Sequence, residues 1–277
     1  SQRTNYGTDY YNKVNFDFII PAPWYNQISE IKNKSFIDDI TPYYLTDRIV
    51  SSKSNSAEIY VYLVDKKSNL DISPFSKDFL IEGNALNQNG IIVDESVKNL
   101  LNISIGDSLS IKIGSKTFAF NVDGVVQPNK FASKLSAIIY FTDEVKDAYE
   151  KSVKHPVYSA AFVKAKDIVE AEHYFNNDYR AMGKAGNRSW YKDDDSYNFA
   201  ISSMKEMPVG KEVTNIAQVK ATAISNTDTA ERMNMKNLFS AGGSVFIANI
   251  VLWLIIILVS RNNIKRMDIA KKGVPVS

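Results

Sequence analysis

The feature that most constrains this chain is a run of 23 residues without a charged side chain, LFSAGGSVFIANIVLWLIIILVS, from Leu238 to Ser260. A transmembrane helix needs about 20 consecutive, mostly apolar residues. At about 1.5 Å per residue this run gives a helix of roughly 34 Å, long enough to cross a bilayer with modest tilt. Core helices of soluble proteins rarely run this long without a charge. The run therefore predicts one transmembrane helix.

The residues on either side of this run predict its orientation. The segment before it carries two basic residues, Arg232 and Lys236, accompanied by Asp228 and Glu231. The segment after it has a single acidic residue, Asp268, and five basic ones, which are Arg261, Lys265, Arg266, Lys271 and Lys272. An excess of Lys and Arg stays in the cytoplasm. We therefore expect these five side chains to anchor a cytoplasmic tail, with the long N-terminal part outside the cell.

The residues before the apolar run have the mixed composition of a globular body large enough for one or two cores. The net charge of the chain is only +2, which argues against nucleic acid as a partner. The chain has no cysteine, which excludes thiol catalysis, cysteine-based zinc sites and iron–sulfur clusters. Since an outer N-terminal part needs an export signal or an earlier membrane helix, we expect the sequence to be a piece of a larger membrane protein.

The N-terminal part of this body reads as mixed α and β structure. Residues 14–20 (VNFDFII) predict a strand, and residues 24–34 a helix. Two more strands are expected at 37–49, broken by Pro42, and at 57–64. The same pattern returns later in the chain, with a strand at 157–163, a helix at 167–179 and a short strand at 188–192.

Between these two parts the pattern changes to short strands and turns. Residues 108–113 and 116–126 alternate in polarity on either side of Gly114 and Ser115, which predicts a β-hairpin. A loop at 83–90, a strand at 91–93, a short helix at 95–101 and a strand at 135–141 complete this β-rich module.

The predicted fold class is α+β, with a β-α-β domain split by an inserted β-rich subdomain. The expected segments are residues 1–66 and 153–205 for the α+β domain, 67–152 for the insertion, 206–237 for a mostly helical stalk or connector, 238–260 for the membrane helix and 261–277 for the cytoplasmic segment.

One short motif suggests an enzyme. Residues 106–110, GDSLS, match the GDSL signature of a class of esterases, in which Ser108 would be the nucleophile. Those enzymes activate the serine with a histidine that has an aspartate three residues before it. Here the residue three before His155 is Ser152, and three before His173 it is Glu170. The run reads more simply as a turn that leads into a strand, so no catalytic residue is assigned.

Other chemistry finds little support in the sequence. His155 and His173 are the only histidines, and they lie far apart with no HExxH motif, so a metal site is not expected. Asp193, Asp194 and Asp195 lack the alternating ligand spacing of a calcium loop. The chain has no P-loop sequence for nucleotide. We therefore expect no metal and no bound cofactor in this chain.

Residues 80–131 resemble the extracytoplasmic core domain of MacB/FtsX-like ABC transporter permeases. The resemblance lies in a glycine loop followed by a strand, an "iGd" turn and an "f.V.GVv" strand. The residues that fit this pattern are Gly83, Ile92, Val93, Glu95, Leu100, Ile105, Gly106, Asp107, Phe120, Val122, Gly124 and Val125. The cytoplasmic end adds to the resemblance, since Arg266, Asp268, Ile269 and Ala270 look like the start of the family's R-x-E-I-A segment, with Asp in place of Glu. Gly273 comes earlier than in the usual spacing.

The resemblance implies a porter-like outer domain on a permease subunit in the plasma membrane, without enzymatic activity of its own. It implies a separate ATPase subunit that binds ATP, a homodimer or paired permease, and coupling by mechanotransmission to export, release or sensing of a peptide, lipid or antibiotic. Two alternatives stay open, which are a membrane-anchored esterase that uses Ser108 and a single-span surface sensor or adhesion protein.

Overall fold

The computed structural model describes residues 5–21, 25–152, 158–179 and 213–225. The chain divides into two compact units, Ser1–Ala221 and Thr222–Ser277, and only residues 222–225 of the second unit are among those described. None of the helices in the described ranges has the length and the apolar sequence of a transmembrane segment. The predicted span Leu238–Ser260 and the basic residues after it lie outside those ranges.

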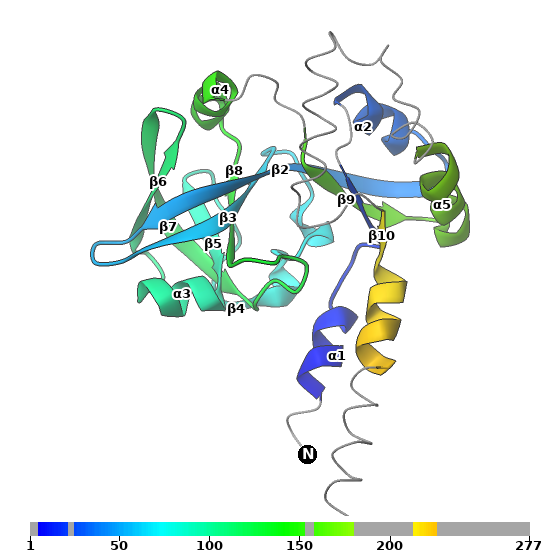
Figure 1. Cartoon of the computed structure of the whole chain (residues 1–277), viewed down its shortest axis with the longest axis horizontal. Helices are drawn as coiled ribbons and strands as arrows, with labels where there is room; N and C mark the ends of the chain where they lie inside the picture. Colours follow the sequence, from blue (N-terminus) through cyan, green and yellow to red (C-terminus); the bar gives the residue numbers. More distant parts are fainter. Residues whose placement is uncertain (1–4, 22–24, 153–157, 180–212, 226–277) are drawn as a thin grey trace, which may run out of the picture. The chain divides into compact units, whose positions relative to one another are not determined.

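The first unit is built on one ten-stranded mixed sheet with helices around it, which confirms the predicted α+β class (Figure 1). Its main path runs β10-β1-β9-β2-β3-β8-β5-β7-β4, and β6 pairs with both β2 and β7. The strands are β1 (Phe18–Pro21), β2 (Ile37–Ser51), β3 (Ser56–Val64), β4 (Leu80–Gly83), β5 (Gly90–Asp94), β6 (Ser108–Ile113), β7 (Lys116–Val126), β8 (Ser136–Tyr140), β9 (Ala160–Ala165) and β10 (Thr214–Asn215). The helices are α1 (Asn5–Asn12), α2 (Tyr25–Lys32), α3 (Glu95–Leu101), α4 (Asp143–Ser152) and α5 (Ile168–Tyr174). Residues 216–221 of this unit and 222–225 of the second unit are also helical.

Six of these strands close on themselves. Strand β2 pairs with β3, β3 with β8, β8 with β5, β5 with β7, β7 with β6, and β6 returns to β2 through Val50 opposite Ile111. Because side chains alternate along a strand, one face of each strand fills the interior of this ring. Burial in β6 follows this rule, since Leu109, Ile111 and Ile113 are buried between exposed neighbours. Figure 1 shows α4 and α3 at opposite ends of these strands, and both helices contribute apolar side chains to the same core.

The longest strand, β2, belongs to both parts of the sheet. Its first half pairs with β9, and its second half pairs with β3 from Tyr43 onward. The break expected at Pro42 is therefore wrong. Proline lacks only the backbone N–H, and residue 42 precedes the start of the β3 ladder, so the strand continues through it.

The part of the sheet formed by β1, β9 and β2 is covered on both faces. One face contributes Phe18, Ile20 and Val163 to a core that side chains of α2 and α5 complete. The opposite face contributes Ile19, Tyr43 and Phe162 to an aromatic-rich core, together with α1 and the segment from Leu70 to Phe79. Burial on both faces explains why all four residues of β1 are buried, without the alternation of a half-exposed strand.

Most predicted elements are present. The hairpin at 108–113 and 116–126 and the helix at 95–101 have the predicted bounds, whereas the helix predicted at 167–179 ends at Tyr174 and continues as a π-helical turn, Phe175–Tyr179. Helices α1 and α4 and the short strands β4 and β10 were not expected. The strand predicted at 188–192 lies outside the described residues. The domain boundaries, including the one at residue 66, stay predictions.

Candidate functional site

The glycines of the sequence resemblance lie where β4 pairs with β7 and in the turn before β6. Gly83 and Gly106 have positive φ angles of 78° and 86°, a conformation that favours glycine. A side chain at Gly83 would collide with the backbone oxygen of Asp123 and lie 2.8 Å from Ile105 Cδ1. At Gly124 a Cβ atom would lie 2.5 Å from the carbonyl oxygen of Asn84. Gly83 and Gly124 thus allow close packing of β4 against β7, and Gly106 provides the positive φ angle of the turn before β6, so the role of these glycines is structural.

The GDSL match lies in the turn before β6. The Asp107 carboxylate accepts a hydrogen bond from Ser104 N at 2.8 Å, which closes the turn, and Ser108 is exposed at the first position of β6. His173 is exposed on α5, whose buried residues belong to a different core from those of β6. Figure 1 shows α5 and β6 at opposite ends of the first unit. The structure does not bring Ser108 and His173 together, and His155 lies outside the described residues.

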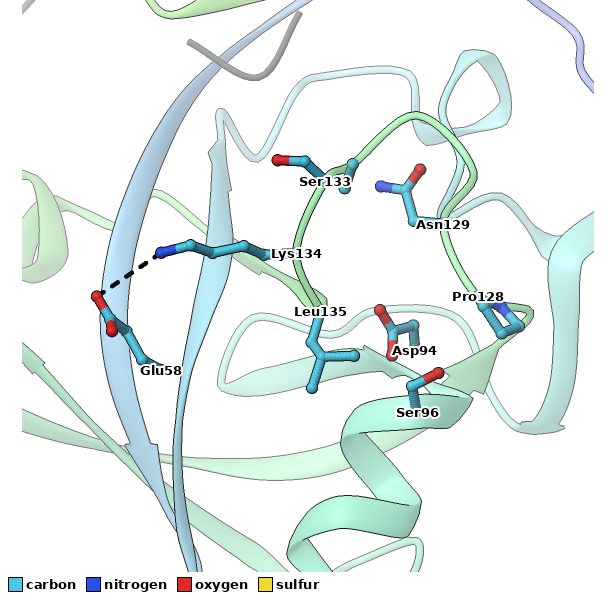
Figure 2. Close-up of a pocket in the computed structure, with 9 residues that line it drawn as sticks. Glu58, Asp94, Ser96, Pro128, Asn129, Ser133, Lys134 and Leu135 are labelled. Atoms are coloured by element: carbon cyan, nitrogen blue, oxygen red, sulfur yellow. Dashed lines mark ion pairs between the residues drawn. The ribbon is translucent and has the colours of Figure 1, made fainter. Parts of the chain in front are cut away.

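A cavity of about 410 Å³ lies beside the loop 127–135, between β7 and β8. Figure 2 shows this loop curving over the hollow, with Asp94 and Ser96 opposite it. The residues that line the cavity are Glu58, Asp94, Ser96, Pro128, Asn129, Ala132, Ser133, Lys134 and Leu135. This volume is within the usual range of small-molecule sites, about 300 to 1,000 Å³. The cavity, named here the loop cavity, is the candidate site.

Asp94 is the most buried charged residue of the loop cavity, with only 2% of its surface exposed. One carboxylate oxygen accepts a hydrogen bond from Val97 N at 2.9 Å and so caps α3. The other oxygen accepts from Ser136 N at 2.7 Å and from Ser136 Oγ at 3.2 Å, which ties β5 to β8. Burial raises the pKa of Asp94 above its usual value, and these hydrogen bonds oppose that rise.

Lys134 directs its ammonium group away from Asp94. Its Nζ forms an ion pair with Asp47 and a longer one, of 3.8 Å, with Glu58 (Figure 2). The same Nζ lies 5.2 Å from the centre of the Tyr60 ring, a cation–π distance. The positive charge of Lys134 is therefore neutralised at the edge of the cavity.

The loop 127–135 also contacts α1. The Phe131 ring lies 6.0 Å from the ring of Tyr10, 6.0 Å from that of Tyr11 and 5.2 Å from that of Phe16. The hydroxyl of Tyr10, a residue with 3% exposure, accepts a hydrogen bond from Lys130 N at 3.2 Å. Phe131 itself follows Asn129 and precedes Ala132, which both line the cavity. One side of the loop thus packs on α1 and the other side forms the cavity wall.

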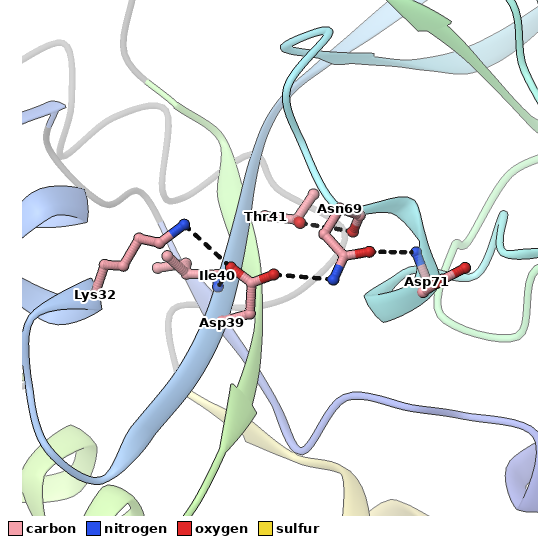
Figure 3. Close-up of polar contacts among 6 residues, drawn as sticks. All are labelled: Lys32, Asp39, Ile40, Thr41, Asn69 and Asp71. Atoms are coloured by element: carbon pink, nitrogen blue, oxygen red, sulfur yellow. Dashed lines mark hydrogen bonds and ion pairs between the residues drawn. The ribbon is translucent and has the colours of Figure 1, made fainter.

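A second polar cluster joins α2, β2 and the turn at Leu70–Ile72. Asp39 on β2 accepts hydrogen bonds from Asn69 Nδ2 at 2.9 Å, from Ile40 N at 2.9 Å and from Lys32 Nζ at 3.3 Å (Figure 3). Burial alone would raise the pKa of Asp39, but these donors outweigh it and lower the pKa. Asn69 also caps the turn through Asp71 N, so the cluster has a structural explanation.

The site residues predicted from the sequence were Arg261, Lys265, Arg266, Lys271 and Lys272, and all of them lie outside the described residues. So do Asp193, Asp194 and Asp195. Within the described ranges, no group of three or more His, Asp or Glu side chains could hold a metal ion. The loop cavity was not predicted from the sequence, although the run VDESV at 93–97 carries a recognisable signal, an aspartate between a strand and a helix.

Comparison with known proteins gives similarity of structure only. No family model matches the chain, and no curated protein matches its sequence. The fold is similar to the extracellular domain of the ABC-type transporter YknZ from Gram-positive bacteria, with 10% identity, a TM-score of 0.43, and coverage of 58% of this chain and 89% of that one. It is also similar to the periplasmic region of MacB from Actinobacillus actinomycetemcomitans, with 14% identity, a TM-score of 0.42, and coverage of 76% and 92%. MacB, the second of these proteins, also gives its name to the family that the sequence motifs resemble.

Proposed function

We propose that this chain is the extracytoplasmic part of a permease subunit of an ABC transporter. In this proposal the α+β body is a porter-like domain with an inserted β-rich subdomain. A helical stalk at 206–237 connects it to the membrane helix at 238–260. Arg261, Lys265, Arg266, Lys271 and Lys272 anchor the cytoplasmic end.

The partner in this proposal is a separate ATPase subunit that binds and hydrolyses ATP, and the permease acts as a homodimer or as a pair. The outer domain itself has no catalytic residue. It exports, releases or senses a peptide, lipid or antibiotic by mechanotransmission, so that movement driven from the cytoplasm reaches the outer body through its helices.

The observation that carries this proposal is the contact of α1 with the loop 127–135. Tyr10 and Phe131 are packed ring against ring, and Tyr10 also holds the loop backbone through Lys130 N. Aromatic side chains in such a core are closely packed and transmit displacement. A shift of α1 would therefore move the wall of the loop cavity, which supports a body that opens and closes a ligand site under mechanical force.

The topology can be tested with single cysteines, because the 277 residues of this sequence contain none. Ser54→Cys lies in the exposed turn between β2 and β3, and Ser277→Cys is the matched change at the C-terminal end. Intact cells are treated with a membrane-impermeant maleimide. We expect labelling of the Ser54→Cys chain and, only after the membrane is permeabilised, of the Ser277→Cys chain. Labelling of Ser277→Cys in intact cells would refute the proposed orientation.

The coupling can be tested on the permease reconstituted in nanodiscs with its ATPase subunit. Phe131→Ala removes the aromatic contact with α1 and should change the rate of ATP hydrolysis by the complex. Ser108→Ala is the matched control, because Ser108 is exposed on β6 outside the loop cavity. Failure of the chain to associate with any ATPase, or equal rates for Phe131→Ala and the wild type, would contradict the proposal. Ester hydrolysis lost in Ser108→Ala would favour the esterase alternative.

A further inference from the structure

The lining of the loop cavity is divided between polar and apolar groups. Asp94, Ser96, Asn129 and Ser133 offer a carboxylate, two hydroxyls and an amide. Pro128, Ala132 and Leu135 supply apolar surface from the loop that curves over the hollow (Figure 2). A ligand group that fits both halves has a polar head and an aliphatic stem.

The charge of the loop cavity favours a cationic head. The hydrogen bonds that the Asp94 carboxylate accepts come from neutral donors, which are the backbone N–H groups of Val97, Ser136 and Ser96 and the hydroxyl of Ser136. None of the ion pairs in the described part of the chain involves Asp94. The one lining cation, Lys134, is paired with Asp47 and Glu58. A buried carboxylate without a cationic partner is costly, and a bound cation would stabilise it.

We propose that the loop cavity binds a primary ammonium group on an aliphatic stem, namely the side chain of a lysine or ornithine in a peptide. The ammonium group lies beside Asp94, whose negative charge it balances, and donates hydrogen bonds to the hydroxyls of Ser96 and Ser133. The stem packs on Ala132 and Leu135. A three-donor ammonium group suits acceptors that converge from several directions.

The same geometry disfavours arginine. A guanidinium group binds a carboxylate best through two parallel hydrogen bonds, one to each oxygen. Both oxygens of Asp94 already accept backbone N–H groups, from Val97 and from Ser136. The two-oxygen edge that arginine needs is therefore occupied, whereas an ammonium group can place its charge beside the carboxylate while its N–H groups bond the hydroxyls of Ser96 and Ser133. Lysine should bind more tightly than arginine.

Saturation-transfer NMR on the full chain in nanodiscs, without an ATPase, tests this inference. The ligands are three capped tripeptides, Ac-Ala-X-Ala-NH2, in which X is lysine, arginine or norleucine. Norleucine keeps the stem and lacks the charge. Because a hydrogen bond to a charged group contributes more than one to a neutral group, we expect lysine to bind about tenfold more tightly than norleucine. We expect arginine to lie between them. Equal binding of lysine and norleucine, or tighter binding of arginine, would overturn the proposal.

Two variants locate the site. Ala132→Leu places three more carbons in the cavity wall and should abolish the preference for lysine. Ala119→Leu is the matched control, because Ala119 is exposed on β7 and does not line the cavity. Lysine binding that survives Ala132→Leu would place the ligand elsewhere and refute the assignment. Since the comparison of the three tripeptides on the wild type needs no variant, poor folding of Ala132→Leu would not leave the inference untested.

The inference is independent of the proposed transport function. Lysine binding by a chain that associates with no ATPase would support the site and contradict the transporter. A chain that is coupled to an ATPase but binds the three tripeptides equally would support the transporter and contradict the site.

Discussion

Asp94→Ala should destabilise α3 and β8 together, because one carboxylate holds both. The change removes the cap of α3 at Val97 N, and loss of an N-cap typically costs about 1 kcal/mol. It also leaves Ser136 N, a donor of a fully buried residue, without its acceptor, which costs roughly 1 to 3 kcal/mol. The expected loss is therefore about 2 to 4 kcal/mol. Asp94→Asn should cost less, because an amide oxygen can still accept from Val97 N.

Hydrogen exchange of the full chain, followed by mass spectrometry, measures this loss locally. If the segments open independently of the rest, a loss of about 2 to 4 kcal/mol makes exchange roughly 30- to 900-fold faster. Peptides that cover Glu95–Leu101 and Ser136–Tyr140 should both show it. Asp38→Ala is the matched control, since Asp38 is an exposed aspartate on β2. An increase of less than about threefold in either peptide would refute the reasoning, because the two hydrogen bonds would then contribute almost nothing.

The stability lost in Asp94→Ala should depend on pH and be larger in acid. Burial raises the pKa of Asp94, so between the unfolded and folded pKa values the folded chain binds more protons than the unfolded chain. The free energy of unfolding contributed by this group is therefore largest below the unfolded pKa and falls as the pH rises through the folded pKa. The stability difference between the wild type and Asp94→Ala should accordingly be larger at mildly acidic pH than at neutral pH. A difference that grows with rising pH would contradict the raised pKa.

Three further changes test other parts of the fold. Gly83→Ala should be much more destabilising than Gly106→Ala in urea unfolding, because both residues have positive φ but only Gly83 lacks room for a Cβ atom; equal losses would be inconsistent with the packing. Tyr10→Phe keeps the ring and removes the hydroxyl that accepts from Lys130 N, so exchange in the loop 127–135 should quicken by an amount that corresponds to about 1 kcal/mol, with no change in β6. The lowered pKa of Asp39 implies a contribution to stability that is present above the unfolded pKa and lost as the pH falls through the folded pKa. The gap between the wild type and Asp39→Asn should therefore close on acidification, which NMR titration and unfolding curves can measure.

Local patterns predicted the elements whose structure depends on neighbours in sequence. The hairpin around Gly114 was predicted from strict alternation in Ser108–Ile113, where every second side chain is buried. Helix α3 was predicted as a short helix at 95–101, and Asp94, the residue directly before it, caps it. In both cases residues within a few positions of one another determine the structure, so the sequence carries the signal directly.

Contacts between distant residues have no comparable signal in the local sequence patterns. Closure of the strand ring depends on Val50 opposite Ile111, a pairing that no local pattern encodes. The loop cavity has the same origin, since Asp94 and Ser136 are far apart in the chain and meet only when β5 pairs with β8. Helix α4 was not predicted because most of its residues are charged, such as Asp147 and Lys151, and its apolar face is narrow. That face is buried at one end of the ring.

The loop 127–135 takes part in both proposals, the mechanical coupling through α1 and the ammonium site in the loop cavity. Thermodynamic linkage makes the connection between them measurable. If displacement of α1 changes the affinity of the loop cavity for an ammonium group, linkage requires the reverse effect as well. The bound ligand must then shift the equilibrium between the two positions of α1 by the same coupling free energy. The lysine tripeptide should then slow hydrogen exchange in α1, and Tyr10→Phe should weaken this effect because it removes one of the contacts that connect the two. The norleucine tripeptide should have no such effect. If hydrogen exchange slows only in the loop 127–135 and stays the same in α1, ligand binding is not coupled to the helix. The mechanical part of the proposal would then have to be abandoned.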